Sequence, residues 1–210
     1  MDSKKKSQFI EYFSKGIKNL NQLKIGVEHE RFLFEGQNKK RISYETLKIF
    51  FQNLKESGWS PIFEKENIIG MQRNKQQITT EPGLQCELSG APLENVHQVC
   101  AESSNFLKEI QLASKGLDLN TVSIGFDPFN NLLEVPRSPK QRYNIMTKEM
   151  PKGGSQSLEM MYRTCGIQIN YDYTSENNFE KIFRLGNYLT PLAIAPVSYT
   201  HLTLPTSDLV

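Results

Sequence analysis

The sequence predicts an α+β fold in which helices flank an antiparallel sheet, and three observations predict it. Apolar residues recur at helical spacing in several segments. Short segments rich in β-branched and aromatic residues lie between them, bounded by glycine, proline and asparagine. The strand segments do not alternate regularly with helices, as they do in wound parallel sheets.

The first elements are a helix and a strand. An amphipathic opening helix is predicted by five apolar residues, Phe9, Ile10, Phe13, Ile17 and Leu20. The segment from Lys24 to Phe34 is apolar and partly β-branched, which predicts a strand. Ser43 is then the expected N-cap of a second helix, and Gly58 its C-terminal stop.

The middle of the chain predicts short strands and one long helix. The strands are expected at 61–64, 68–72, 76–81 and 85–89. Pro82 and Gly83 separate the last two. The longest helical segment follows from Leu93 to Lys115 and ends at Gly116.

The rest of the chain predicts two more strands and a last helix. Residues 121–126 form the first strand, and residues 165–173, which alternate strictly between apolar and polar, form the second. Between them, the proline- and glycine-rich segment 135–154 predicts an irregular loop around one short helix. The last helix is expected to open at Ser175 and to end before Pro191.

Composition argues against several classes of partner. The net charge is only +2 over 210 residues, and the basic residues are spread along the chain except for Lys4 to Lys6, so we expect no nucleic-acid partner. No apolar run approaches the roughly 20 residues that span a bilayer, and no secretory signal is visible, so we expect no membrane partner and a cytoplasmic protein. The three cysteines lack a CxxC pair and predict buried, reduced thiols.

Two pairs of glutamates are candidates for a metal site. Glu28 and Glu30 are two residues apart in the first strand, so their side chains share a face. Like charges in an apolar strand repel unless a cation lies between them, and Mg²⁺ favours carboxylate oxygens. Glu81 before the Pro-Gly turn and Glu87 in the next strand can join the same site. The alternative is that these strand faces are simply exposed to solvent.

Other polar residues are candidates for holding a substrate. Gln168 and Asn170 lie on the polar face of the alternating strand, where amides can orient a nucleotide or an amino acid. Arg142 and Arg163 flank part of the proline- and glycine-rich segment, and a guanidinium is well shaped to hold a carboxylate or phosphate. The alternative is a solvated strand face and two surface arginines.

Several long segments resemble, in order, those of a known family. They are IGVEHERFLF at 25–34, ITTEPGLQCELSGAPL at 78–93, HQVCAES at 97–103, QRYNIM at 141–146 and MPKGGSQSLEMMYRTCGIQINYDYTSE at 150–176. Together they are similar to the plant and proteobacterial type of glutamate-cysteine ligase over roughly residues 8–195.

The resemblance implies a fold and a reaction. The fold is similar to the catalytic domain of glutamine synthetase, with an antiparallel sheet whose carboxylates hold magnesium and ATP. The reaction is the joining of the γ-carboxylate of glutamate to the amine of cysteine through γ-glutamyl phosphate, the first step of glutathione biosynthesis. The alternatives are a related carboxylate-amine ligase with another acceptor, or an inactive nucleotide- or metal-binding piece.

The resemblance also assigns roles to individual residues. Four glutamates are implied to be metal ligands, namely Glu28, Glu30, Glu81 and Glu87. Arg142 is implied to bind the glutamate substrate and act in catalysis together with Arg163, and Gln168 and Asn170 are implied to line the same site.

The chain departs from the family pattern at two places. Leu84 and Cys86 stand where the family usually has glycine and phenylalanine, and Leu84 lacks the backbone freedom of glycine. After Pro196 the chain no longer resembles the family. We therefore expect residues 1–195 to be the N-terminal part of an incomplete catalytic domain and 196–210 to be a non-native tail, the alternative being a short strand from Ser198 to Leu204.

Overall fold

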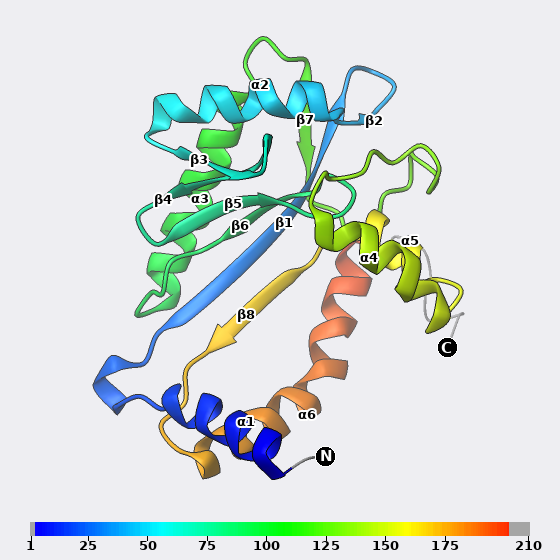
Figure 1. Ribbon diagram of the computed structural model, residues 1–210. Helices are drawn as coiled ribbons and strands as arrows, with labels where there is room; N and C mark the ends of the chain where they lie inside the picture. Colours follow the sequence, from blue (N-terminus) through cyan, green and yellow to red (C-terminus); the bar gives the residue numbers. More distant parts are fainter. Residues whose placement is uncertain (1–2, 202–210) are drawn as a thin grey trace. The chain divides into compact units, whose positions relative to one another are not determined.

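The computed structural model describes residues 3–201, which fall into two compact units. The larger unit comprises Gly26–Ile169, and the smaller unit combines the two ends of the chain, Met1–Ile25 and Asn170–Val210. The larger unit carries nearly all of the sheet (Figure 1).

An eight-stranded sheet has the order β2-β1-β6-β5-β4-β3, with β7 and β8 also paired to β1. The strands are β1 (Ile25–Glu35), β2 (Lys40–Arg41), β3 (Ser60–Glu64), β4 (Asn67–Arg73), β5 (Gln76–Thr80), β6 (Cys86–Ser89), β7 (Leu119–Val122) and β8 (Ile167–Tyr171). The pairs β1–β2, β1–β6, β1–β7, β3–β4, β4–β5 and β5–β6 are all antiparallel. The predicted α+β class with an antiparallel sheet is confirmed.

Two helices cover one face of this sheet (Figure 1). They are α2 (Tyr44–Leu54) and α3 (Val96–Ala113). As predicted, Ser43 caps α2, because its Oγ accepts a hydrogen bond from the backbone nitrogen of Thr46 at 3.1 Å. The short 3₁₀ helix Lys55–Ser57 follows, and Gly58 ends it with a φ of +83°, which glycine adopts without strain.

The main core lies between these helices and the sheet. Its buried side chains come from α2, α3 and the central strands and include Leu33, Leu47, Phe50, Phe51, Met71, Ile78, Leu88, Phe106 and Ile110. Fully burying one such side chain stabilises a fold by roughly 1.5–3 kcal/mol. This packing fixes which face of β1, β5 and β6 is turned away from α2 and α3, and that face carries the candidate glutamates.

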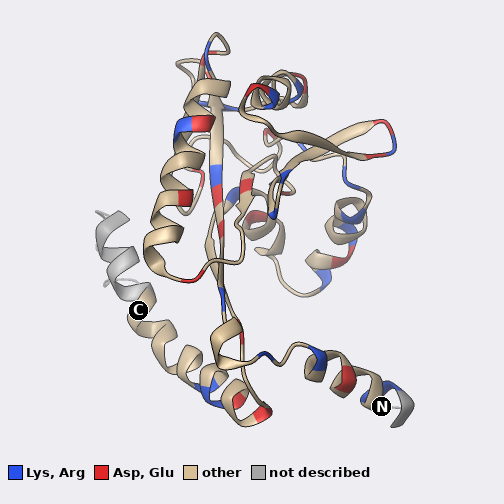
Figure 2. Cartoon of the chain, turned by 90° about the vertical axis from the view of Figure 1, so that its left-hand side faces the viewer, with Lys and Arg blue, Asp and Glu red and all other residues tan. Residues whose placement is uncertain are grey.

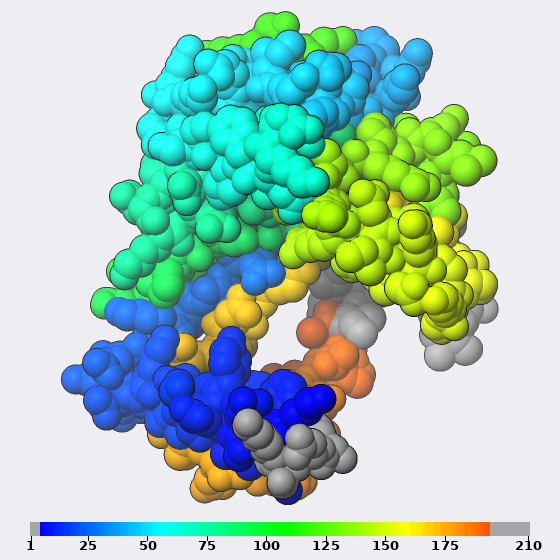
Figure 3. Space-filling model, in the orientation of Figure 1, coloured from blue at the N-terminus to red at the C-terminus, as the bar shows by residue number. Residues whose placement is uncertain are grey.

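A second, smaller cluster is built by α4 (Gln141–Glu149), the 3₁₀ helix Met150–Lys152 and α5 (Ser157–Arg163). Its buried residues are Val135, Tyr143, Met161 and Tyr162. The backbone nitrogen of Gln141 donates to Glu64 Oε2 at 2.7 Å, and that of Ser138 donates to the carbonyl of Pro82 at 2.9 Å. The yellow-green α4 segment therefore lies against the cyan and teal strands in Figure 3.

The smaller unit contains α1 (Ser3–Lys15), the 3₁₀ helix Leu20–Gln22 and α6 (Glu176–His201). The hydroxyl of Tyr173 donates to the carbonyl of Phe13 at 2.5 Å, and Phe179 contacts both rings, with centroids 5.1 and 6.1 Å away. Lys18 pairs with Asp172 at 2.7 Å. These contacts join the beginning of the chain to the segment after β8.

Three predicted helix or strand bounds differ from the structure. The opening helix ends at Lys15, short of the predicted Ile17 and Leu20, and Gly16 follows it, where a Cβ would lie 2.6 Å from the Tyr173 hydroxyl. The strand expected at 121–126 is instead β7, Leu119–Val122. The last helix does not end before Pro191, since α6 runs to His201, and a proline costs a helix one hydrogen bond without always ending it.

The alternative strand from Ser198 to Leu204 is wrong over Ser198 to His201, which are helical. Residues 202–210, which complete the expected tail, lie outside the described residues. In the described part of the chain, no helix has the length and apolar character needed to cross a membrane. Along the ribbon, lysine and arginine positions are interspersed with aspartate and glutamate positions (Figure 2).

Candidate metal centre

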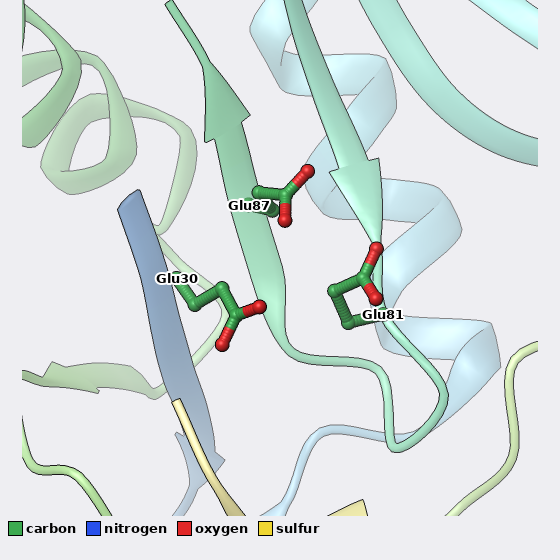
Figure 4. Close-up of side chains that lie close together, drawn as sticks. All are labelled: Glu30, Glu81 and Glu87. Carbon is green, nitrogen blue, oxygen red and sulfur yellow. The ribbon is translucent and has the colours of Figure 1, made fainter. Parts of the chain in front are cut away.

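Three glutamates come together on the sheet face that is turned away from α2 and α3 (Figure 4). Glu30 in β1 stands directly opposite Glu87 in β6, and Glu81 directly follows β5. Thr79 is the β5 partner of Glu87, so Glu81, two residues further on, projects from the same face. One oxygen of each carboxylate lies within 4.8 Å of the others. We call these three residues the carboxylate triad.

Each carboxylate of the triad is held by hydrogen bonds. Glu30 Oε2 accepts from the backbone nitrogen of Gly166 at 2.6 Å. Glu87 Oε1 accepts from Ser89 Oγ at 3.0 Å, and Glu81 Oε1 accepts from the hydroxyl of Tyr143 at 3.1 Å. These donors fix the side chains in place before any ligand binds.

Burial and mutual repulsion act on all three carboxylates. The pKa of Glu30 is raised, first by burial and then by the charges of Glu87 and Glu28, against the lowering effect of the Gly166 bond. The pKa of Glu87 is raised by burial and by the charge of Glu81. Burial also raises the pKa of Glu81. Half-buried carboxylates that repel one another form a site that favours a cation, and oxygen ligands suit Mg²⁺.

The turn after β5 positions Glu81. The backbone nitrogen of Glu81 donates to the carbonyl of Gln85 at 2.8 Å, and that of Leu84 donates to the carbonyl of Glu81 at 2.9 Å. Leu84 has a φ of +59°, the left-handed conformation that favours glycine, and its side chain is fully buried in the main core. The chain therefore makes the turn although leucine stands where the resembling family has glycine.

A buried arginine stabilises this turn by hydrogen bonding to its backbone. The side chain of Arg41 is fully buried, and its Nη2 donates to the carbonyl of Gly83 in the turn. Its Nη1 donates to Asp127 Oδ2 and to the carbonyl of Tyr162, both at 3.3 Å. One guanidinium thus connects β2, the Glu81 turn and the end of α5.

Two cations stand on the Glu81 side of the triad. Arg142 Nη2 lies 3.6 Å from Glu81 Oε1 and donates to the hydroxyl of Tyr143 at 2.6 Å, while its side chain is 62% exposed. Lys140, which precedes α4, is only 6% exposed. Burial lowers the pKa of Lys140, whereas the charges of Glu81 and Glu87 raise it. Both cations are therefore close enough to influence an anion bound beside the triad.

A cavity of about 270 Å³ adjoins Glu30 and Glu81. Four methionines form much of its wall, namely Met146, Met150, Met160 and Met161, and its polar lining includes Gln85, Thr164 and Gln168. The volume is close to the roughly 300 Å³ at which ligand pockets begin, which suits a molecule of amino-acid size. Flexible methionine side chains can adapt to the shape of such a molecule.

The other predicted site residues do not belong to the carboxylate triad. Glu28 is on the face of Glu30 by spacing, and its charge acts on Glu30 and Glu87, but it does not belong to the group within 4.8 Å. Gln168 is exposed, and its Nε2 donates to Glu30 Oε1 at 3.4 Å. Asn170 is exposed and belongs to the smaller unit.

Arg163 binds protein groups near its own helix. Its Nη1 donates to Glu159 Oε2 at 2.6 Å and its Nη2 donates to the carbonyl of Asp127 at 2.8 Å. Its guanidinium also lies 4.4 Å from the ring centroid of Phe126. In this geometry Arg163 shapes the segment beside α5, and a role with substrate stays a prediction.

Sequence reasoning missed Lys140, Tyr143, Gly166 and Ser89. A lysine just before a helix is usually exposed, so nothing local indicates that Lys140 is buried. Of these four residues, only Tyr143 had a signal in the sequence, because it lies beside Arg142 in the QRYNIM segment. The Gly166 contribution is a backbone nitrogen, which no residue type predicts.

Comparison with known proteins identifies the family. The family model described as glutamate-cysteine ligase family 2 matches residues 24–197. The chain belongs to this family. It is 41% identical over 191 residues to a chloroplastic glutamate–cysteine ligase of Medicago truncatula, a match that covers 90% of this chain and 38% of the relative.

Two further members of the family give the same result. A chloroplastic glutamate–cysteine ligase A of Oryza sativa subsp. japonica is 41% identical, with 90% of this chain and 39% of the relative covered. The chloroplastic enzyme of Arabidopsis thaliana is 38% identical, with 90% and 37% covered. The chain thus spans less than two fifths of the length of these relatives.

The comparison corrects one prediction. We expected a cytoplasmic protein because no leader is visible, but these relatives are named chloroplastic, which contradicts that expectation. The start of a chain that covers so small a part of its relatives says nothing about targeting, and that inference was therefore unsound.

Proposed function

We propose that the protein to which this chain belongs joins the γ-carboxylate of glutamate to the amine of cysteine, using ATP and Mg²⁺. The observation that carries the proposal is the carboxylate triad, found in a chain of glutamate-cysteine ligase family 2. The names of the relatives support the ligation of glutamate to cysteine. ATP and γ-glutamyl phosphate enter through the resemblance of the signature segments.

The triad suits the metal that such a reaction needs. Glu30, Glu81 and Glu87 would hold Mg²⁺, and Glu28 on the same face would add negative charge or a ligand for a further ion. A bound Mg²⁺ neutralises the charge that spreads over phosphoryl oxygens during transfer. The hydrogen bonds from Gly166, Ser89 and Tyr143 keep the carboxylates oriented for it.

The cavity and Arg142 suit the amino-acid substrate. The mostly exposed guanidinium of Arg142 can hold a carboxylate, and it lies next to Glu81, which lines the cavity. A glutamate held there would have its γ-carboxylate close to the metal, so that attack on a phosphoryl group needs little reorientation. Gln168 lines the same cavity, while Arg163 and Asn170 remain in the proposal through the resemblance alone.

The same proposal includes the wider fold. An antiparallel sheet with carboxylates on one face supports a likeness to the glutamine synthetase catalytic domain. Residues 1–195 would be the N-terminal part of that domain, and the family match to residues 24–197 supports the assignment of most of them, although it ends two residues beyond this boundary. Residues 196–210 would be a non-native tail.

An assay of the protein expressed from the complete gene tests the proposal. Formation of γ-glutamylcysteine and ADP should require glutamate, cysteine, ATP and Mg²⁺ together. Replacing cysteine with other amines tests the alternative of a different acceptor. Glutamate- and ATP-dependent product with another amine but none with cysteine would reject the ligation proposed, and the absence of any ATP turnover would reject ligase activity.

A further inference from the structure

Lys140 is a buried cation whose ammonium group makes no hydrogen bond within residues 3–201. The residue is 6% exposed, and it is the N-cap residue of α4. The contact recorded for Nζ is with the ring of Tyr143, whose centroid lies 5.5 Å away. A buried lysine normally has its N–H donors satisfied.

The charge of Lys140 lies near the triad without pairing to it. The charges of Glu81, Glu87 and Glu64 all favour the ammonium form. In return, the charge of Lys140 favours the ionised forms of Glu81 and Glu87. Among the ion pairs of the described chain, however, none shorter than 4.0 Å joins Lys140 to a carboxylate.

An ammonium that served only to neutralise the triad would gain from direct contact with it. Such a salt bridge would give its N–H donors carboxylate acceptors. Several side-chain nitrogen and oxygen atoms are fully buried and have no hydrogen-bond partner, but Lys140 Nζ is not one of them. The stem is therefore fixed by burial, while the tip stays accessible beside the carboxylates.

We propose that Lys140 is a ligand-binding residue whose ammonium donates to a phosphate oxygen of a polyphosphate, while other oxygens of the same polyphosphate bind the cation held by the triad. This inference rests on the proposed function, because it needs the triad to hold a metal. It adds a direct protein contact to the phosphate chain, which the carboxylates cannot make because they only accept hydrogen bonds. A nucleoside triphosphate and free tripolyphosphate present the same chemistry.

Calorimetric titration of the 210-residue chain separates the contributions. The first titrant is Mg²⁺ alone, the second is tripolyphosphate with saturating Mg²⁺, and the third is ATP with saturating Mg²⁺. The variants are Lys140→Met, which keeps the length and apolar stem of the side chain, and Lys140→Arg, which keeps the charge. Lys75→Met is the matched control, because Lys75 is exposed in the hairpin between β4 and β5.

The expected result is a selective loss. Lys140→Met should weaken binding of Mg-tripolyphosphate about tenfold or more, as expected for a charge-assisted hydrogen bond. It should leave Mg²⁺ affinity unchanged or slightly higher, since one positive charge near the metal is removed. Lys140→Arg should recover part of the lost affinity, and Lys75→Met should have no effect. An equal loss for ATP and tripolyphosphate places the contact on the phosphate chain.

Two outcomes would overturn the inference. If Lys140→Met changes Mg²⁺ affinity but not polyphosphate affinity, Lys140 acts only as a counter-charge to the triad. If Lys140→Met leaves tripolyphosphate affinity unchanged, and a further titration with glutamate shows weaker binding, the ammonium binds a carboxylate instead. Failure of the wild-type chain to bind Mg²⁺ at all would reject the metal site itself, which is a different result from either of these.

A measurement on the unmodified side chain covers the case in which Lys140→Met does not fold. Lysines labelled with ¹³C at Cε are observed by NMR, and Lys140→Arg assigns the Lys140 signal by its disappearance. The Lys140 signal should move when tripolyphosphate is added with Mg²⁺, while the Lys75 signal stays in place. A Lys140 signal that does not respond would contradict the contact.

Discussion

Glu30 of β1 and Glu87 of β6 are directly opposite one another in the antiparallel sheet, so two half-buried carboxylates share a face with no residue between them. Opposed like charges destabilise a sheet. Glu81 adds a third carboxylate within 4.8 Å. The repulsion between these carboxylates therefore destabilises the sheet at the place where we propose that a metal binds.

Removing one charge should stabilise the metal-free protein. In Glu87→Gln the side chain keeps an oxygen for the Ser89 hydroxyl and loses the repulsion from Glu81 and Glu28. We expect a gain of on the order of 1 kcal/mol or less after solvent screening, seen as a thermal transition about 2 °C higher in the presence of EDTA. Mg²⁺ at a given concentration should then raise the transition less than it does in wild type.

The pH dependence of this difference follows from the raised pKa values. A carboxylate whose pKa is raised on folding stabilises the fold below its ordinary value of 4.5 and loses that contribution as the pH rises through the folded pKa. The advantage of Glu87→Gln over wild type should therefore be small near pH 4.5 and grow toward pH 8. Glu66→Gln, at an exposed position, is the control. An advantage that does not grow with pH would argue against repulsion in the triad.

Leu84→Gly tests whether burial outweighs backbone strain in the Glu81 turn. Glycine would relieve the φ of +59°, a gain of about 1 kcal/mol. It would also remove a fully buried leucine from the main core, where truncation costs about 2–5 kcal/mol. We expect a net loss of about 1–4 kcal/mol in the free energy of unfolding, measured with urea. A stabilised variant would show that strain dominates.

Arg41→Met should destabilise the fold more than most substitutions. It leaves Asp127 without its cation and the carbonyls of Gly83 and Tyr162 without a donor. Breaking a buried ion pair costs about 3–5 kcal/mol. In a urea titration, the free energy of unfolding of Arg41→Lys should lie between those of wild type and Arg41→Met, because lysine keeps the charge but not the two-nitrogen geometry. Equal stability of all three would contradict a structural role for Arg41.

The three thiols should differ in reactivity. Cys86 is fully buried, and burial raises its pKa to about 12. Burial and the charge of Glu30 raise the pKa of Cys165. Cys100 is exposed, so the prediction of buried thiols is wrong for this residue. At pH 8, Ellman's reagent should modify Cys100 rapidly and the other two only after denaturation. Rapid reaction of two or more thiols in the folded protein would contradict this placement.

Much of the fold could be predicted because its signals are local. The Ser43 cap, the Gly58 stop and the strand β8 all depend on neighbouring residues, and each is present in the structure, although all five residues of β8 are exposed and neither of its faces is buried. The two-residue strand β2 and the helix α5 were missed, because Lys40 and Arg41 gain their strand conformation by pairing with β1, and α5 lies within a segment without clear periodicity. Such elements depend on contacts that are distant in sequence.

The candidate site could be predicted only in part for the same reason. Spacing places Glu28 with Glu30, and the turn places Glu81 near Glu87, but the register that brings Glu30 opposite Glu87 follows from strand pairing. Lys140 and Tyr143 reach the triad through the packing of α4, which no local pattern encodes. Asn170 looked equivalent to Gln168 in the alternating strand, yet the two residues belong to different units.

Magnesium binding to the triad tests the central claim most directly. Mg²⁺ is titrated at pH 8 into the wild-type chain and into Glu30→Gln, Glu81→Gln and Glu87→Gln, with Glu66→Gln as the control. We predict that each triad variant loses about tenfold or more in Mg²⁺ affinity, because each removes a charged ligand, and that the control matches wild type. Equal affinity in all five proteins, or no binding to the wild type, would contradict the claim that Glu30, Glu81 and Glu87 form a metal site.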